Sequence, residues 1–160
     1  MLKYAGICLL SVCMAIYGVI KSADIKKALV LRKSVTQLLH HIENSVTYTG
    51  KSKDDIFNNF STTDTSLLAF LRELCNTDET EKCINRHLDI LSKKDKQMLT
   101  AFFNGLGKST RREKEAKYCR LFTEEFERQG IDAEKEQMNK IMLYRKLGII
   151  FALITAVIFL

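Results

Sequence analysis

Two uncharged apolar stretches lie at the ends of the chain, and a charged middle separates them. Tyr4–Ile20 and Leu147–Leu160 contain no charged residue. Counted back to Ile141, the second stretch has 20 residues, which as α-helix is about the thickness of a bilayer core. The pattern predicts transmembrane helices over residues 1–21 and 141–160. At the membrane interface, where aromatic rings and long basic side chains are favoured, we expect Tyr144, Arg145, Lys146 and Gly148.

A cleaved signal peptide is the alternative interpretation of the first stretch. Cleavage needs small residues, and Gly18, Ser22 and Ala23 provide them only loosely. Leu10-Ser11-Val12-Cys13 is similar to a lipoprotein box, but Val12 is bulky where a small residue is expected. A retained membrane helix is therefore favoured.

The middle of the chain carries apolar residues at helical spacing. Val35, Leu38, Leu39, Ile42 and Val46, for example, recur with the period of a helix. No segment alternates with the period of a strand, and the chain contains no Pro. The expected helices are about six, near residues 24–48, 53–60, 67–74, 79–91 and 93–104, with a long arm after Ser109.

Glycines and capping residues set the expected helix ends. Gly50 is a plausible C-terminal stop, and Ser52 and Ser92 are plausible N-caps. Gly130 lies inside the long arm, so a continuous arm and a broken arm both fit the sequence. The predicted fold class is all-α, with a helical bundle over residues 22–140 between the two transmembrane helices.

Charge distribution predicts which side of the membrane the middle occupies. All 19 acidic residues lie between Asp24 and Glu136, and 24 of the 25 basic residues lie between Lys21 and Lys146. Basic residues next to membrane spans favour the cytoplasmic side. We therefore expect a cytoplasmic bundle whose net charge of 24 minus 19, or +5, suits anionic lipid. No feature indicates a nucleic-acid partner.

The cysteines and histidines give no strong site. Five Cys without regular spacing do not form a disulfide framework, and a reducing compartment is favoured. Cys83 and His87 are four residues apart and would share a helix face, but two ligands do not make a zinc site. The adjacent His40 and His41 would point to different sides of a helix. We expect no metal, no cofactor and no catalytic residues.

Gly107-Lys108-Ser109 is similar to the end of a phosphate-binding loop. The full pattern needs a Gly where this chain has Phe102, and the loop should follow a strand. A turn at Gly107 with a helix cap at Ser109 is therefore favoured over nucleotide binding.

The charged segment after this turn mixes both signs at helical spacing. Such a segment is usually a solvated helix face, and it also suits docking of a partner protein. The candidate docking residues are Arg111, Arg112 and Glu115.

These short motifs together resemble the stage III sporulation protein AB family of endospore-forming bacteria. The similarity is strongest at Leu106-Gly107-Lys108-Ser109 and at Tyr144-Arg145-Lys146-Leu147-Gly148, which leads into the terminal apolar stretch. Met1-Leu2-Lys3, and Tyr48 with Gly50, are weaker matches. The layout covers essentially the whole chain.

The resemblance implies a function that the residues alone do not. That family is similar to the inner-membrane platform protein of type II secretion, whose cytoplasmic unit is a six-helix bundle. It implies a multi-pass protein of the mother-cell membrane, in a secretion-like channel complex between mother cell and forespore. Implied partners are a cytoplasmic ATPase, other membrane subunits of the complex, and lipid. The alternatives are an unrelated membrane-tethered regulatory or signalling module and an enzyme, either a nucleotide hydrolase using Lys108 and Ser109 or a protein with a metal site at Cys83 and His87.

Overall fold

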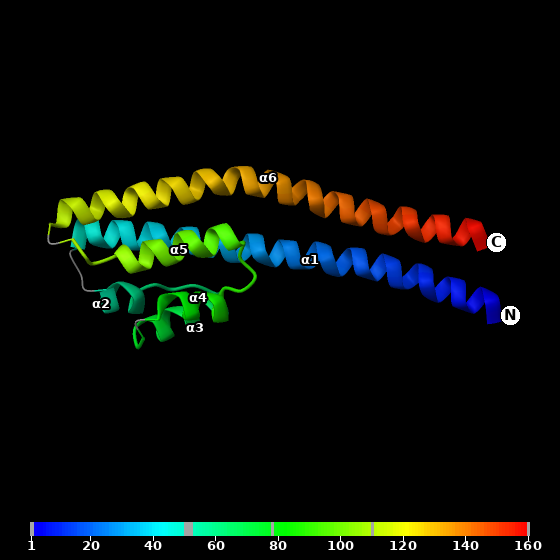
Figure 1. Ribbon diagram of the computed structural model, residues 1–160, viewed down its shortest axis with the longest axis horizontal. Helices are drawn as coiled ribbons and strands as arrows, with labels where there is room; N and C mark the ends of the chain where they lie inside the picture. The colour runs from blue at the N-terminus through cyan, green and yellow to red at the C-terminus, as the bar shows by residue number, and fades with distance from the viewer. Residues whose placement is uncertain (1, 50–52, 78, 110, 160) are drawn as a thin grey trace. The chain divides into compact units, whose positions relative to one another are not determined.

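The computed structural model describes residues 2–49, 53–77, 79–109 and 111–159, and shows side chains mainly between residues 12 and 157. This part of the chain is helical and contains no strand, which confirms the all-α class. Its α-helices are α1 (Leu2–Asn44), α2 (Lys53–Asn58), α3 (Thr65–Leu74), α4 (Thr80–His87), α5 (Lys93–Gly105) and α6 (Arg112–Phe159), with a π-helical turn at Ser45–Thr49 (Figure 1).

Several helix boundaries differ from the predicted ones. Helix α1 runs through Lys21 without the interruption expected before Asp24, because no Gly or Pro lies between Val19 and Asn44. Helix α6 passes through Gly130 without a break, so the continuous arm is the correct alternative. Helix α4 ends at His87, short of the predicted Leu91. The expected stop at Gly50 and cap at Ser52 lie outside the described residues.

Side-chain caps begin two of the short helices. The Asp64 carboxylate accepts hydrogen bonds from the backbone N–H groups of Ser66 and Leu67, at 3.0 and 3.2 Å. The Ser92 hydroxyl accepts from the Asp95 N–H at 3.1 Å, which confirms the cap predicted there. Each cap satisfies N–H groups that have no partner within the helix.

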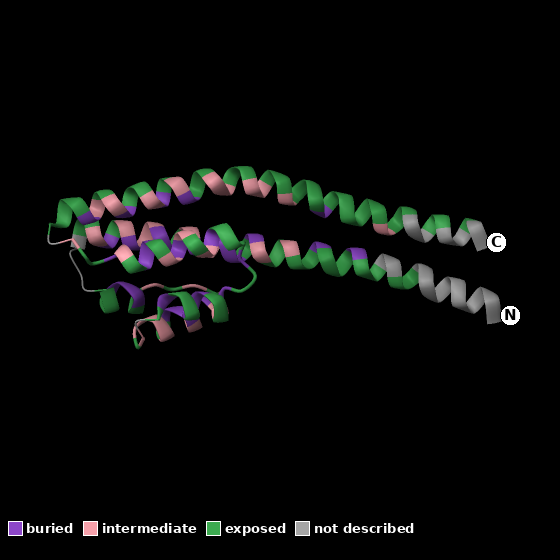
Figure 2. Ribbon diagram, viewed as in Figure 1, coloured by how far each residue is buried: buried purple, intermediate pink, exposed green. Residues whose placement is uncertain are grey.

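One compact unit covers Val30–Ile131 and contains the apolar core. The core draws on all six α-helices, with buried faces turned toward one another in the bundle (Figure 2). Phe103 is central, because its ring meets those of Phe57, Phe70 and Phe102 in edge-on arrangements at 5.2 to 6.1 Å between centroids. Such edge-to-face contacts add to the gain from apolar burial.

The second unit consists of Met1–Leu29 and Asp132–Leu160. In it α1 and α6 approach closely at Gly18, where an added Cβ would lie 2.9 Å from the Tyr144 carbonyl oxygen and 3.5 Å from the Gly148 Cα. The Arg145 Nε donates to the buried Ser22 hydroxyl at 3.1 Å. Gly148 and Arg145, predicted as membrane-interface residues, therefore lie at the contact between two helices.

Many large apolar side chains of this second unit are exposed. Among the described residues, Val12, Ile16 and Val19 on α1 and Ile149, Leu153 and Val157 on α6 are all roughly half exposed or more. No helix in the described residues is both long enough and apolar enough to cross a membrane. The predicted spans at 1–21 and 141–160 fall partly on side chains outside that description, including those of residues 2–11.

Candidate functional site

The loop between α5 and α6 holds the phosphate-loop-like motif. Gly107 has a φ of 80°, in the left-handed region that side chains other than Gly rarely adopt. The Lys108 N–H donates to the Gly105 carbonyl at 3.3 Å, which closes a tight turn. The Ser109 hydroxyl donates to the Arg111 carbonyl at 3.3 Å. Because α6 begins at Arg112, Ser109, the predicted helix cap, lies three residues before the helix.

Glu115 binds this loop from the first turns of α6. One of its carboxylate oxygens accepts the Gly107 N–H, and the other accepts the Ser109 N–H at 3.2 Å. A bound phosphate would need these same N–H groups, and a buried carboxylate in their place would repel it. The loop is therefore an anion cradle that already holds an anion of the same chain, which argues against nucleotide binding.

Arg112 ties the start of α6 to the end of α1. Its Nε donates to the Val46 carbonyl at 3.0 Å and its Nη2 to the Thr47 carbonyl at 2.6 Å. A cation at the C-terminal end of a helix satisfies carbonyls that lack intrahelical partners and interacts favourably with the helix dipole. Two of the three predicted docking residues, Arg112 and Glu115, thus make contacts within the chain, and Arg111 is exposed.

The roles of Glu115 and Arg112 were not predicted, because both residues lie in a charged segment whose pattern is typical of a solvent-exposed helix face. The available signal was Gly107 followed eight residues later by an acidic residue. Charge alone does not reveal this pairing, since exposed glutamates at such spacing are common.

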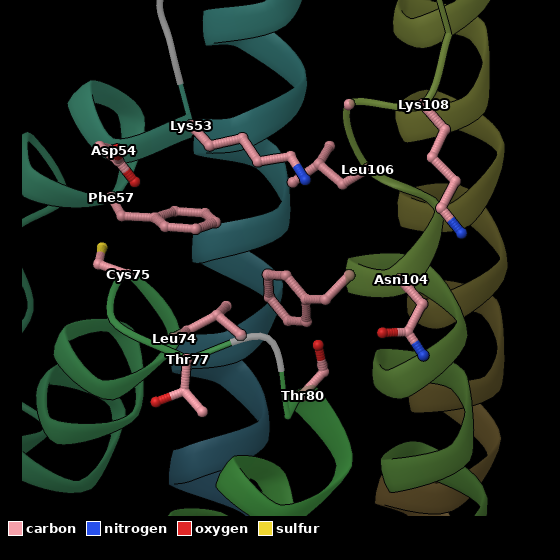
Figure 3. A pocket seen from close by; sticks show the side chains of 12 residues that line it. Lys53, Asp54, Phe57, Leu74, Cys75, Thr77, Thr80, Asn104, Leu106 and Lys108 are labelled. Atoms are coloured by element: carbon pink, nitrogen blue, oxygen red, sulfur yellow. The ribbon is translucent and has the colours of Figure 1, made fainter.

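A pocket of about 480 Å³ opens beside the same loop, where α2, the α3–α4 turn and the end of α5 meet (Figure 3). Phe57, Phe103 and Leu106 are buried beneath it, and Lys53 and Lys108 stand on its rim. Asp54 and Asn104 add polar atoms. Among the described residues its lining includes no His and a single carboxylate, that of Asp54.

Cys83 and His87 do share a helix face, and the fold adds Glu73 from α3. The carboxylate of Glu73 receives both the His87 ring and the Arg86 guanidinium. The hydrogen bond from His87, above all, lowers the pKa of Glu73. Burial, followed by the charge of Glu73, raises the pKa of the Cys83 thiol.

This cluster is unsuited to nucleophilic chemistry. A nucleophilic or metal-binding cysteine needs an accessible thiolate, and Cys83 is buried with a raised pKa. In the described part of the chain no group of three His, Cys, Asp or Glu side chains is placed to hold a metal. His40 and His41 diverge, since His40 meets Glu127 on α6 and His41 meets the Ile56 carbonyl.

A buried ion pair that the sequence did not reveal joins α1, α5 and α6. Arg32 and Asp95 are both 7% exposed, and the Arg32 Nε lies 3.2 Å from the Asp95 Oδ1. The Arg32 Nη2 donates to the Phe126 carbonyl at 3.0 Å, and the guanidinium lies over the Phe126 ring at 4.6 Å. The Ser92 hydroxyl donates to the other Asp95 oxygen at 2.7 Å. Each charge is therefore paired and hydrogen-bonded, as burial requires.

Gly130 has its role in this cluster. A Cβ at Gly130 would overlap the Arg32 Nη1. The glycine that suggested a helix break instead leaves room for a guanidinium against the surface of α6.

The fold and these clusters define a class: a small all-helical protein with two long helices, whose described residues hold polar clusters that join helices and no catalytic set. Comparison with known families gives the particular assignment. A family model for stage III sporulation protein AB matches residues 3–160, and the chain belongs to this family. No curated protein and no solved structure gave a significant match.

Membership places the chain in stage III of spore formation. It confirms the family resemblance found in the sequence, and it removes the alternative of an unrelated tethered module. The family is one of sporulation assembly proteins and is not a known enzyme family.

Proposed function

We propose that this chain is a non-catalytic platform component of the channel complex between mother cell and forespore. It is held in the mother-cell membrane by its second unit and presents the compact unit, Val30–Ile131, to the cytoplasm. There the compact unit docks the ATPase of the same complex. The second unit contacts lipid and the other membrane subunits.

The observation that carries this proposal is the exposed apolar surface of the second unit. Val19, Leu153 and Val157 are each more than 60% exposed on helices with few charges nearby. Apolar patches of this kind mark a protein or membrane contact. Lys21, Lys26 and Lys27 follow one apolar stretch, and Lys140 and Lys146 precede the other. This arrangement suits helices that enter lipid from the cytoplasmic side.

The contact between α1 and α6 supports the same arrangement. Small residues let transmembrane helices approach closely, and Gly18 and Gly148 meet in this way. The hydrogen bond from Arg145 to Ser22 fixes the register of the two helices. It also satisfies polar atoms that would be costly to leave unpaired near lipid.

Membrane extraction and thiol labelling of sporulating cells test this location. We expect the full chain to remain in the membrane fraction after an alkaline carbonate wash. With other exposed cysteines replaced, Thr63→Cys, on an exposed turn of the compact unit, should react with an impermeant maleimide only after the cells are opened. Release by carbonate, or labelling of Thr63→Cys in intact mother cells, would contradict the proposal.

A further inference from the structure

One face of α6 in the compact unit carries an exposed leucine between two grooves. Leu121 is 55% exposed. It lines a groove of about 560 Å³ beside α1, near Tyr48, and another of about 510 Å³ beside α5, near Met98. Tyr48 is itself 78% exposed. The Leu121 side chain therefore lies between two grooves, and no described segment of the chain covers it.

Two residues of opposite charge lie at equal distances along α6 on either side of Leu121. Lys117 precedes Leu121 by four residues and Glu125 follows it by four, so the three side chains form one i±4 ridge of the helix. Lys117 lines one groove and Glu125 lines the other. Lys117 is exposed, and in the described residues no ion pair is seen for it, whereas the Glu125 carboxylate accepts hydrogen bonds from Arg128 and Gln129 of its own helix, each at 2.6 Å.

We propose that this ridge docks a second copy of the same chain. Two i±4 ridges pack together when helices cross at about 50°. With the two copies antiparallel about Leu121, Lys117 of each lies beside Glu125 of the other. The same patch then serves on both sides, as a two-fold interface requires. The contact thus buries two leucines and forms two ion pairs.

The neighbouring charges set the size of this contact. In the antiparallel pairing, Lys114 of one copy lies on the same side as Arg128 of the other, seven residues from Leu121 in each, and both carry positive charge. The crossing angle separates them, and the grooves beside Leu121 leave room for the crossing helix. A contact of about two helical turns is smaller than the roughly 1,200 Å² that stable complexes bury. The dimer is therefore weak and depends on concentration, and it is independent of the ATPase docking proposed above.

Crosslinking of the full chain in membranes tests the pairing. Leu121→Cys is introduced where Cys8, Cys13 and Cys75 are replaced by Ser, and a short bismaleimide is added. We expect a covalent dimer. Asn85→Cys, an exposed position on α4, is the matched control and should give about tenfold less, because it lies outside the ridge. Equal dimer from both positions, or none from Leu121→Cys, overturns the proposal.

Charge exchange distinguishes this interface from any other self-contact. Lys117→Glu alone places like charges opposite each other and should lower the dimer at Leu121→Cys about tenfold, as should Glu125→Lys alone. Co-expressed with different tags, the Lys117→Glu copy and the Glu125→Lys copy should crosslink to each other and only poorly to themselves. Circular dichroism verifies that each variant keeps its helix content. Folded variants that crosslink regardless of charge overturn the proposal, and point to the second unit or to a different partner on this ridge.

Discussion

At the scale of single residues, several charged side chains of the described structure bind other atoms of the same chain. Arg32, Glu115 and Arg112 each bind atoms of a different helix or loop. In a segment rich in Lys, Arg and Glu, such groups look the same as solvated ones in the sequence. The distinction comes from burial and from partners distant in sequence, as with Arg32 and Asp95, which lie 63 residues apart.

The buried pair at Arg32 gives the first prediction. Arg32→Met should lower the free energy of unfolding by about 3–5 kcal/mol, because it leaves the Asp95 carboxylate buried without its partner. Replacing both, as Arg32→Met with Asp95→Leu, should recover much of that loss. Denaturant unfolding of the full chain in mild detergent measures both. An equal or larger loss in the double variant would show that the pair is not the source of the effect.

The second prediction concerns Gly130, where substitution by Ala should change the free energy of unfolding in the direction opposite to the usual one. Gly→Ala inside a helix normally stabilises by about 1 kcal/mol. Gly130→Ala should destabilise instead, because its Cβ displaces a guanidinium held by Asp95 and the Phe126 carbonyl. Asn139→Ala, exposed on the same helix, is the control and should stabilise slightly. A gain at Gly130 similar to the control would place Arg32 elsewhere in solution.

The loop motif gives a third prediction. Glu115→Ala should lower the free energy of unfolding by about 1–3 kcal/mol, since two N–H groups lose a buried acceptor. Lys108→Ala should leave both stability and spore formation unchanged, because Lys108 is exposed on a turn whose N–H groups are taken. Sporulation lost in a folded Lys108→Ala variant would restore the nucleotide hypothesis.

At the scale of helices, periodicity predicted the existence of the elements better than their ends. The apolar stripe from Val35 to Ile42 is buried as expected, and so are Phe102 and Phe103. The change from apolar to charged composition near Lys21 predicts a boundary, and hence two helices where the structure has the single helix α1. The backbone follows local propensity, and nothing near Ser22 interrupts it. Gly130 suggested a possible break in α6, but the helix is continuous there. The glycine instead leaves room for the Arg32 side chain.

Helix packing also sets the reactivity of the cysteines. Cys119, on the buried face of α6, has its pKa raised to about 12 by burial and by the charge of Glu115. Because the thiolate is the reacting form, Cys83 and Cys119 should resist iodoacetamide in the folded chain at pH values below those raised pKa values. Both should react once the chain is unfolded. Mass spectrometry after timed labelling tests this, with Thr63→Cys, at an exposed position of the compact unit, as the internal control. Rapid native labelling of Cys119 would mean that α6 leaves the core.

At the scale of the whole molecule, the sequence was sufficient to predict the all-α fold class and the family. It was not sufficient to predict the candidate site. The loop at Gly107 is defined by Glu115, and the ridge at Leu121 by two grooves whose walls come from α1 and α5. Both depend on which helices become neighbours, and a single amphipathic stripe does not specify that.

The proposed platform role leads to a further prediction about partner binding. Arg112 is exposed as well, but its guanidinium binds the Val46 and Thr47 carbonyls, and Glu115 is buried against the loop, so Arg111 is the docking residue that we expect to meet a partner. Contacts through exposed charges weaken as salt rises. Arg111→Glu should therefore weaken partner binding while leaving the helix content unchanged. Arg112→Glu should also lower stability, since it removes the cap on Val46 and Thr47.

Purification of the tagged full chain from sporulating cells in mild detergent tests the central claim most directly. The account predicts that the ATPase of the complex copurifies at low salt, less so at high salt, and several-fold less with Arg111→Glu. Lys53→Glu, at the rim of the pocket on the same unit, is the matched control and should retain the ATPase. Recovery of the folded chain without any ATPase at low salt would contradict the account.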